Sequence, residues 1–291
     1  MIKLLTVVIP TYRSSKIIVK LLKTLPKEIK IIIIENSFDN KFKKEIEKKF
    51  KNVKVFLKKN IGFGRAINFA TKNIKTKYFI AINPDTIFYK KTISNLISAA
   101  EKIDIFGAIG PTHIDNKKSI KSNLFTEKKK INGPAMMFKT KIFKKIKGFD
   151  DNIFLYYEDN DIYHKCNILN LKLYLINNSF YNHSKQIKHN KSLNVKSSSF
   201  KDINEKNNSH FIGGWHGQWS KFYYYKKYRG FFNALIICLP NVILNIIQLI
   251  VYTFLNPTKA KYKYYKVEGF LCSLIGMPSF KRSNFDQKNI Y

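Results

Sequence analysis

The sequence predicts an α/β protein whose core is a doubly wound, Rossmann-like sheet, followed by an apolar helical extension. Three observations lead to this prediction. In the first ~110 residues, short apolar runs alternate with helical patterns, as in parallel sheets whose strands are joined by helices. Hydrophobic residues make up 45% of the 291 residues, which is ample for a core. The most apolar segment, Phe231–Leu255, lies apart from this alternation.

Strands and helices are predicted in alternation as far as Ile109. The strands are rich in β-branched residues and suit burial on both faces of a sheet. Ser14 or Ser15 can cap the first helix, and Thr92 lies near the start of the fourth. The predicted strands are Leu4–Ile9, Ile29–Ile34, Val53–Leu57, Tyr78–Asn83 and Ile105–Ile109. The predicted helices are Ser15–Leu25, Asn40–Phe50, Phe63–Ile74 and Thr92–Ile103.

The pattern is looser beyond this alternating region. A strand-like run at Ile131–Phe138 precedes a Lys-rich helical stretch that ends at Gly148, and Leu171–Ile176 is a further predicted strand. Residues 184–210 are rich in Ser, Asn and Lys and are predicted to form a loop. We expect one α/β domain over residues 1–230 and an apolar, basic extension over residues 231–291.

The apolar segment Phe231–Leu255 is long enough to cross a membrane, although a proline and several amides interrupt it. Lys and Tyr residues crowd both of its flanks. We predict one or two helices that lie in the membrane interface. A true membrane span and ordinary packing onto the α/β domain are the alternatives. The interrupting residues are Asn233, Pro240, Asn241, Asn245 and Gln248.

The formal net charge of +34 comes almost wholly from Lys residues that are scattered among Ile and Asn. Binding of nucleic acid would require basic residues on one face, with Arg side chains that reach phosphates and bases. We interpret most of these lysines as solvated surface charges, and attraction to an anionic membrane surface is the second interpretation. Nucleic acid is not an expected partner.

The cysteines and the N-terminal segment predict a reducing, cytoplasmic location. Cys166, Cys238 and Cys272 are far apart and form no CxxC pair, so the sequence indicates neither a disulfide framework nor a zinc site. The run Leu4–Ile9 is too short for the core of a signal peptide and meets Pro10. Together with the C-terminal segment, this predicts a peripheral protein on the cytoplasmic face of the inner membrane.

A carboxylate follows the predicted strand Tyr78–Asn83, in the sequence Asn83-Pro84-Asp85. The carboxyl ends of strands are where α/β sheets open their ligand crevice. Mg²⁺ and Mn²⁺ are commonly held by one or two carboxylates together with substrate phosphates. Asp85 is therefore a candidate metal ligand, and a metal there would neutralise the charge on a departing nucleoside diphosphate.

A second acidic cluster, Glu158-Asp159-Asn160-Asp161, follows the aromatic run that begins at Phe154. Three carboxylates within four residues repel one another, although an exposed helix N-terminus accepts acids readily. One of them can act as a general base toward an acceptor hydroxyl. His183 lies after the predicted strand Leu171–Ile176 and is a candidate metal ligand or diphosphate contact.

Three further segments can line the binding site of a nucleotide donor. Val8–Tyr12 and Glu35–Ser37 end the first two predicted strands, at the edge where a base and a ribose can be held. Asn60–Gly64 is a glycine-bearing turn into a helix, which presents backbone N–H groups, and Arg65 follows it. The turn lacks the full glycine pattern of a dinucleotide-binding oxidoreductase.

The order of these motifs resembles the inverting family 2 glycosyltransferases with a GT-A fold, and within them the rhamnosyltransferase-like branch. The resemblance runs from residue 5 to about residue 230 and returns at Gly269–Arg282. It implies a mixed central sheet. The segments that carry it are Val7–Tyr12, Ile34–Ser37, Asn60–Gly64 with Ala66 and Asn68, Asn83–Thr86, Gly133–Met137, Gly148–Asp150, Phe154–Asp161, His183 and Trp215–Lys227.

The resemblance implies a role for each matching position. Asp159 would be the catalytic base, supported by Glu158 and Asp161. Asp85 would bind Mg²⁺ or Mn²⁺, and His183 would contact the metal or the diphosphate. Asn83 stands in place of the first acid of the usual Asp-x-Asp motif, Glu35 stands where Asp is more common, and Arg65 could approach a phosphate. The nucleotide-sugar would be lined by Pro10, Thr11, Tyr12, Glu35, Asn60, Gly62, Phe63, Arg65 and Asn83.

The expected function is therefore metal-dependent, inverting transfer of a sugar from a nucleotide-sugar donor. The branch implies a deoxysugar donor such as dTDP-rhamnose, and the acceptor would be a growing surface polysaccharide or a lipid-linked glycan. Residues 1–230 would form the catalytic domain, and residues 231–291 would associate with the membrane. A non-catalytic scaffold with this fold and a basic nucleic-acid-binding protein are the alternatives.

Overall fold

The computed structural model describes residues 2–119, 123–131, 133–183 and 203–282, and for 118–119 and 203–210 it describes the backbone only. The chain forms two compact units. The sheet unit comprises Met1–Ile61, Arg65–Phe149 and Ile162–Ser199, and the helical unit comprises Gly62–Gly64, Asp150–Asp161 and Phe200–Tyr291. The helix α7 (Ile203–Arg229) therefore groups with the predicted extension at 231–291, although it precedes residue 231.

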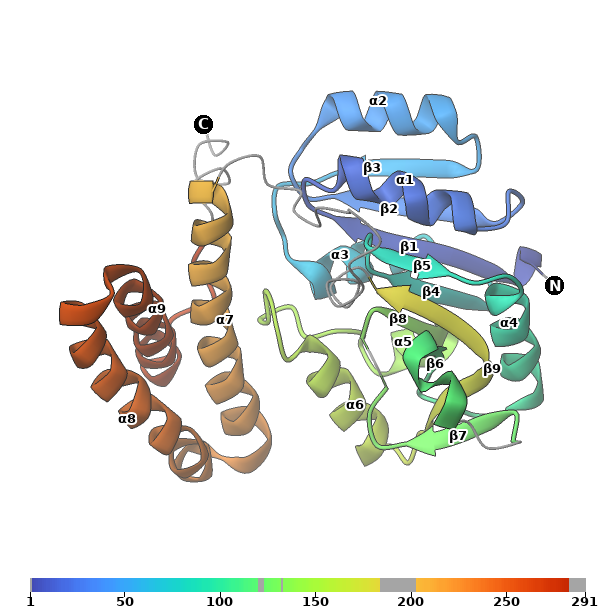
Figure 1. Ribbon diagram of the computed structural model, residues 1–291. Coiled ribbons are helices and arrows are strands. Elements are labelled where there is room, and N and C mark those ends of the chain that lie inside the picture. Colours follow the sequence, from blue (N-terminus) through green and yellow to red (C-terminus); the bar gives the residue numbers. More distant parts are fainter. Residues whose placement is uncertain (1, 120–122, 132, 184–202, 283–291) are drawn as a thin grey trace. The chain divides into compact units, whose positions relative to one another are not determined.

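The sheet unit is built on a nine-stranded mixed sheet in the order β3-β2-β1-β4-β8-β6-β9-β5, with β7 paired to β9 (Figure 1). Its first half is parallel, because β1 lies between β2 and β4 and β2 pairs with β3. β8 runs antiparallel to both β4 and β6. The strands are β1 (Leu5–Thr11), β2 (Lys30–Glu35), β3 (Val53–Leu57), β4 (Tyr78–Ile82), β5 (Thr86–Phe88), β6 (Ala108–His113), β7 (Phe125–Lys128), β8 (Ala135–Lys139) and β9 (Leu173–His183).

Side-chain alternation along β4 divides the core into two faces. Tyr78, Ile80 and Ile82 belong to the large apolar cluster, to which α1 (Ser15–Thr24), α2 (Asn40–Lys49) and α4 (Thr92–Lys102) also contribute. Phe79 packs instead in an aromatic group with Phe138, Phe143 and Phe149. Both faces of β4 are buried, which explains why this strand is a continuous apolar run.

The predicted elements of the alternating region are mostly confirmed. The four helices begin where predicted and end one to three residues earlier than predicted. The strand predicted after the fourth helix was misplaced. β6 begins at Ala108 and not at Ile105, which is exposed. β9 begins at Leu173 and extends to His183, well past the predicted end, because it pairs with β5, β6 and β7 in turn.

The hydroxyls of Ser14 and Thr92, at the starts of the first and fourth helices, bond outside these helices. Ser14 does occupy the position before α1, but its hydroxyl donates to the carbonyl of Tyr12. Thr92 is the first residue of α4, and its hydroxyl donates to the carbonyl of Phe180 at 2.7 Å. The side-chain cap at Ser14 was therefore wrong, whereas Thr92 does lie at the start of the fourth helix, as predicted.

The helical unit consists chiefly of three long helices that pack side by side (Figure 1). They are α7 (Ile203–Arg229), α8 (Phe231–Leu255) and α9 (Pro257–Leu274). Phe222, Cys238 and Phe270 form part of the small core between them. The predicted loop was wrong over 203–210, where α7 begins, and residues 184–202 lie outside the described part of the chain.

α8 is one continuous helix with Pro240 inside it. Only one face packs on α7 and α9, through Ala234, Cys238 and Val242. By length and composition α8 could cross a membrane, with a mean hydropathy of 2.4 over the best window, of which 22% is buried. The exposed face includes Phe232, Ile236, Ile243, Leu244, Ile247, Ile250 and Phe254.

Candidate active site

Asp85 and His183 meet at one end of the sheet unit. Asp85 follows β4 and directly precedes β5, and the register of β5 with β9 sets Thr86 opposite His183. The Asp85 Oδ1 and the His183 Nε2 are 2.9 Å apart, and their side chains are only 19% and 12% exposed. The topology thus brings together two residues that are 98 positions apart in the sequence.

The geometry of this pair fits a divalent cation. Nε2 of His183 is buried and, among the described residues, has no hydrogen bond of good geometry despite its short distance to Asp85. Buried polar atoms normally have a partner, so such an atom beside a carboxylate oxygen marks a position for a ligand. In the described part of the chain, no three His, Cys, Asp or Glu side chains are placed so that they could hold a metal ion together, so phosphates and water would complete the shell.

The ends of β1 and β2 lie side by side, as predicted, because Thr11 pairs with Glu35 in the parallel register. The Thr11 hydroxyl donates to Glu35 Oε2 at 2.6 Å, and the Ser37 N–H donates to Oε1 at 2.7 Å. Glu35 is buried and thus organises this edge of the sheet. Its contact with a ribose, like the predicted roles of Pro10 and Tyr12 beside it, stays a prediction.

The glycine-bearing turn leads into α3 (Phe63–Thr71), as predicted. Gly62 has φ +84°, and a Cβ there would lie 2.3 Å from the carbonyl oxygen of Phe154, so only glycine fits. Arg65 is exposed on the first turn of α3, and Asn60 and Asn83 are half-buried. The binding roles of these residues and of Phe63 stay predictions.

The acidic cluster opens α6 (Glu158–Ile168), where the helix dipole favours negative charge. Burial raises the pKa of Glu158 to about 8, and the charge of Asp159 adds to the rise. The Asp159 Oδ1 accepts hydrogen bonds from the backbone N–H of Asn160 at 2.8 Å and from its amide at 3.1 Å. Asp159 is thus a half-buried carboxylate beside Glu158, whose carboxyl group is mostly protonated at pH 7.

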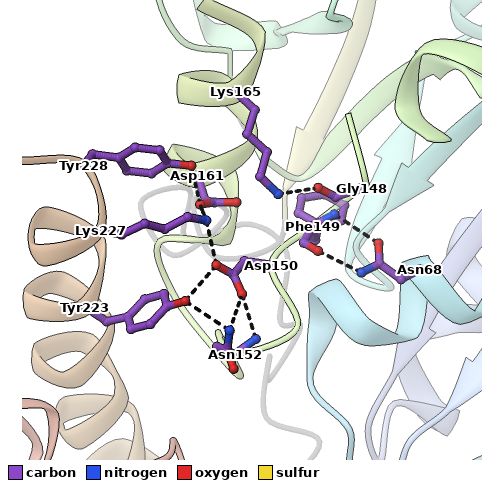
Figure 2. Close-up of polar contacts among 10 residues, drawn as sticks. All are labelled: Asn68, Gly148, Phe149, Asp150, Asn152, Asp161, Lys165, Tyr223, Lys227 and Tyr228. Carbon is purple, nitrogen blue, oxygen red and sulfur yellow. Dashed lines mark hydrogen bonds and ion pairs between the residues drawn. The ribbon is translucent and has the colours of Figure 1, made fainter. Parts of the chain in front are cut away.

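Asp161 has partners that the sequence did not indicate (Figure 2). Its Oδ1 accepts from Lys227 Nζ at 2.5 Å and from the Tyr228 hydroxyl at 2.7 Å. Lys227 also donates to Asp150 Oδ2 at 2.6 Å, as does Tyr223 at 3.0 Å. Burial lowers the pKa of Lys227, but the bonds to both carboxylates outweigh this and raise it.

The resemblance included both Asp150 and Lys227 in matching segments, but it assigned no role to them. The other two residues of the Gly148–Asp150 motif, Gly148 and Phe149, belong to the sheet unit and have different hydrogen-bond partners (Figure 2). The Asn68 side chain bonds the backbone N–H and C=O of Phe149, and Lys165 donates to the carbonyl of Gly148 at 2.8 Å. The acidic motif alone could not reveal these partners, because they come from other elements.

The two tyrosines before the acidic cluster have an unusual backbone. Tyr156 and Tyr157 both adopt the left-handed conformation, with φ of +65° and +67°. Bulky residues seldom adopt it, and such strain gathers at functional sites. Tyr157 packs against Tyr224 and Tyr225 of α7, with ring centroids 5.4 and 6.4 Å apart.

Comparisons with solved structures show a GT-A-like fold, as predicted. The structure of GalNAc-T7 with UDP, GalNAc and Mn²⁺ matches with a TM-score of 0.53 and 14% identity, over 62% of this chain and 43% of that one. The mannosyltransferase PcManGT from Pyrobaculum calidifontis, in complex with GDP-Man and Mn²⁺, matches with a TM-score of 0.52 and 12% identity, over 93% and 86%.

Sequence comparisons identify the family. An uncharacterized glycosyltransferase of Rickettsia typhi is 26% identical over 185 residues, which make up 56% of this chain and 58% of that protein. The model of glycosyl transferase family 2 matches residues 6–174, more than half of the chain. The chain therefore belongs to glycosyl transferase family 2.

Proposed function

We propose that this protein is an inverting glycosyltransferase that moves a sugar from a nucleotide-sugar donor to a glycan acceptor. The observation that carries the proposal is the Asp85–His183 pair, in a chain of glycosyl transferase family 2. A carboxylate and an imidazole at the ends of β4 and β9 suit a metal–diphosphate complex.

Asp159 is the proposed base. It accepts the proton of the acceptor hydroxyl while that oxygen attacks the anomeric carbon of the donor. The bond between that carbon and the diphosphate oxygen breaks, and the nucleoside diphosphate leaves with the electron pair. A single displacement of this kind inverts the configuration at the anomeric carbon. Glu158 and Asp161, its neighbours, support the base.

Asp85 and His183 would hold Mg²⁺ or Mn²⁺. When bound, the ion would neutralise the negative charge on the leaving diphosphate. The structures of GalNAc-T7 and PcManGT contain Mn²⁺, which supports a divalent cofactor here. Pro10, Thr11, Tyr12 and Glu35 would bind the nucleoside.

The proposed donor is a deoxysugar nucleotide such as dTDP-rhamnose, on the basis of the rhamnosyltransferase-like motifs. UDP and GDP-Man in the two neighbouring structures make UDP- and GDP-sugars the necessary comparison. The proposed acceptor is a growing surface polysaccharide or a lipid-linked glycan of the cell envelope.

We place the protein on the cytoplasmic face of the inner membrane. Support comes from the exposed apolar face of α8 and from the net charge of +34, which favours an anionic surface. A helix with one apolar face and flanking Lys and Tyr residues suits the membrane interface.

Donor hydrolysis by the purified protein tests the proposed function. dTDP-rhamnose and a panel of UDP- and GDP-sugars are incubated with Mn²⁺, with Mg²⁺ and with a chelator. We expect slow, metal-dependent release of nucleoside diphosphate from one donor. If no donor is hydrolysed and nucleotide titration shows no metal-dependent binding, the proposed enzyme is wrong and a non-catalytic scaffold remains.

A further inference from the structure

A pocket of about 460 Å³ lies within the helical unit, and none of its lining residues is a candidate catalytic, metal-binding or donor-binding residue. It is lined by α7, α9 and the loop of Tyr156 and Tyr157, and α7 and α9 run side by side in Figure 1. Its volume is within the usual range for small-molecule sites. None of its nine lining residues is acidic, and Lys221 and Lys266 are both among them.

The two lysines give the pocket an uncompensated positive charge. In the part of the chain that the structure describes, neither ammonium group pairs with a carboxylate. Burial lowers the pKa of Lys266, and the like charges of Lys263 and Lys221 lower it further. Its Nζ lies 5.3 Å from the ring centroid of Tyr262, which offers only a weak interaction. An anion would relieve this repulsion.

Glycines on α7 let aromatic side chains approach the helix backbone in this pocket. A Cβ at Gly214 would lie 2.6 Å from the Tyr262 ring, and one at Gly213 would lie 3.0 Å from the Tyr156 hydroxyl. Two aromatic side chains can therefore approach the helix backbone closely only because Cβ atoms are missing. Their rings and hydroxyls, together with the amide of Gln218, suit a sugar and its polar substituents.

We infer that this pocket binds a phosphate group attached to a sugar or a lipid, and that it holds the phosphorylated part of the acceptor. The two ammonium groups recognise the phosphate oxygens, and the side chains of Tyr156 and Tyr262 face the sugar or lipid that is attached to the phosphate. The acceptor assignment rests on the proposed function, whereas phosphate binding can be measured without catalysis.

Glucose 1-phosphate is the soluble probe, titrated by calorimetry without divalent cations so that the diphosphate site does not compete. We expect the dissociation constant to rise at least ~10-fold in the double variant Lys221→Gln/Lys266→Gln, which loses two charge-assisted contacts. The matched control is Lys226→Gln/Lys259→Gln, which removes equal charge from the same helices outside the pocket and should change the constant less than ~2-fold.

Gly217→Leu supplies a test that leaves every charge in place. A Cβ there has its nearest neighbour, the Tyr156 ring, at 3.8 Å, so the backbone need not move and the longer side chain enters the pocket. Leu also favours a helix more than Gly does. We expect a loss of affinity similar to that of the double lysine variant, with unchanged fluorescence of Trp215 and Trp219.

Vesicles identify the source of the phosphate. Competition by phosphatidic acid vesicles, but not by phosphatidylcholine vesicles, would assign it to a lipid, and binding without such competition would assign it to a soluble phosphorylated glycan. The inference would be overturned if both lysine double variants weakened binding of glucose 1-phosphate equally. It would also be overturned if Gly217→Leu had no effect on that affinity, or if the wild type did not bind the probe. If the protein binds the phosphate probe but hydrolyses no donor, the result contradicts the proposed function and leaves this inference standing.

Discussion

The three carboxylates of the acidic cluster differ at the scale of single residues. Glu158 is half-buried with its Oε2 shielded from solvent, its pKa is raised to about 8, and it is mostly protonated at pH 7. Asp161 is fully buried and already bonded to Lys227 and Tyr228. Asp159 is half-buried, and its Oδ1 accepts hydrogen bonds from the neighbouring Asn160. A base must be ionised and within reach of a hydroxyl, so Asp159 is the best placed of the three.

Asp159→Asn is therefore expected to lower the turnover number by at least ~100-fold, because a general base contributes about that factor. Donor affinity should be retained, since the amide has the same shape. Steady-state kinetics with the identified donor and calorimetry with its nucleotide measure the two effects. Asp151→Asn, an exposed acid eight residues earlier, is the control and should have normal turnover. Near-normal turnover in Asp159→Asn would contradict the assignment of the base.

Asp85→Ala is expected to abolish the metal dependence of nucleotide binding, since it removes the carboxylate of the pair with His183. Calorimetry with the nucleoside diphosphate, with and without Mn²⁺, measures this. Asp115→Ala is a matched control, because Asp115 lies 3.4 Å from His113 in a second Asp–His pair of the sheet unit. If Mn²⁺ strengthens binding equally in both variants, the metal site lies elsewhere.

The sequence could predict Asp85 and His183 separately but could not show that they meet. Each follows a strand, but their contact depends on β9 reaching His183 and on its pairing with β5, neither of which periodicity predicts. The partners of Asp161 were missed for the same reason, because Lys227 is one of many lysines and the segment Trp215–Lys227 carried no assigned role.

At the scale of elements, the link between the start of α6 and the end of α7 depends on Lys227. It bonds to Asp150 and Asp161, and removing it leaves a buried carboxylate without its cation. We expect Lys227→Met to lower the free energy of unfolding of the helical unit by roughly 2–4 kcal/mol. Urea unfolding followed by tryptophan fluorescence reports on this unit, because both tryptophans, Trp215 and Trp219, lie in α7.

Two variants show whether this cost is electrostatic. Asp161→Asn combined with Lys227→Met removes the stranded charge and should recover part of the lost stability. Lys226→Met changes the exposed neighbouring lysine and should cost less than about 0.5 kcal/mol. Equal destabilisation by Lys226→Met and Lys227→Met would show that the network contributes nothing specific.

Most elements of the alternating region were predictable because their strands are mostly apolar and each helix has one apolar face, whereas the short β5 and the polar, exposed β7 were not. α7 was not, since it carries aromatic, glycine and polar residues on all sides and lacks a single apolar face. Its packing against both α8 and α9 explains this, because a helix with two neighbours buries more than one stripe.

At the scale of the whole molecule, the sequence indicated a chain with an α/β part and an apolar C-terminal part. The boundary expected at residue 230 separates α7 from α8, whereas α7 shares a core with α8 and α9. Tertiary contacts between helices decide such a boundary, and no composition change marks residue 203. The membrane association proposed for this part therefore has to be tested without removing a helix from that core.

Replacing exposed α8 residues tests it while leaving the core intact. Ile236, Ile243 and Ile250 recur every seven residues on one face and are 69%, 48% and 59% exposed. Changing all three to Gln should lower partitioning into vesicles by roughly 100-fold, if each isoleucine contributes about 1 kcal/mol when inserted. The control changes three exposed apolar residues of the sheet unit, Phe38, Ile105 and Ile168, to Gln. Flotation with neutral and with anionic vesicles separates insertion from attraction by the net charge, because only the charge term weakens as salt rises. Unchanged flotation in the α8 variant, or an equal loss in the control, would show that this face does not bind the membrane.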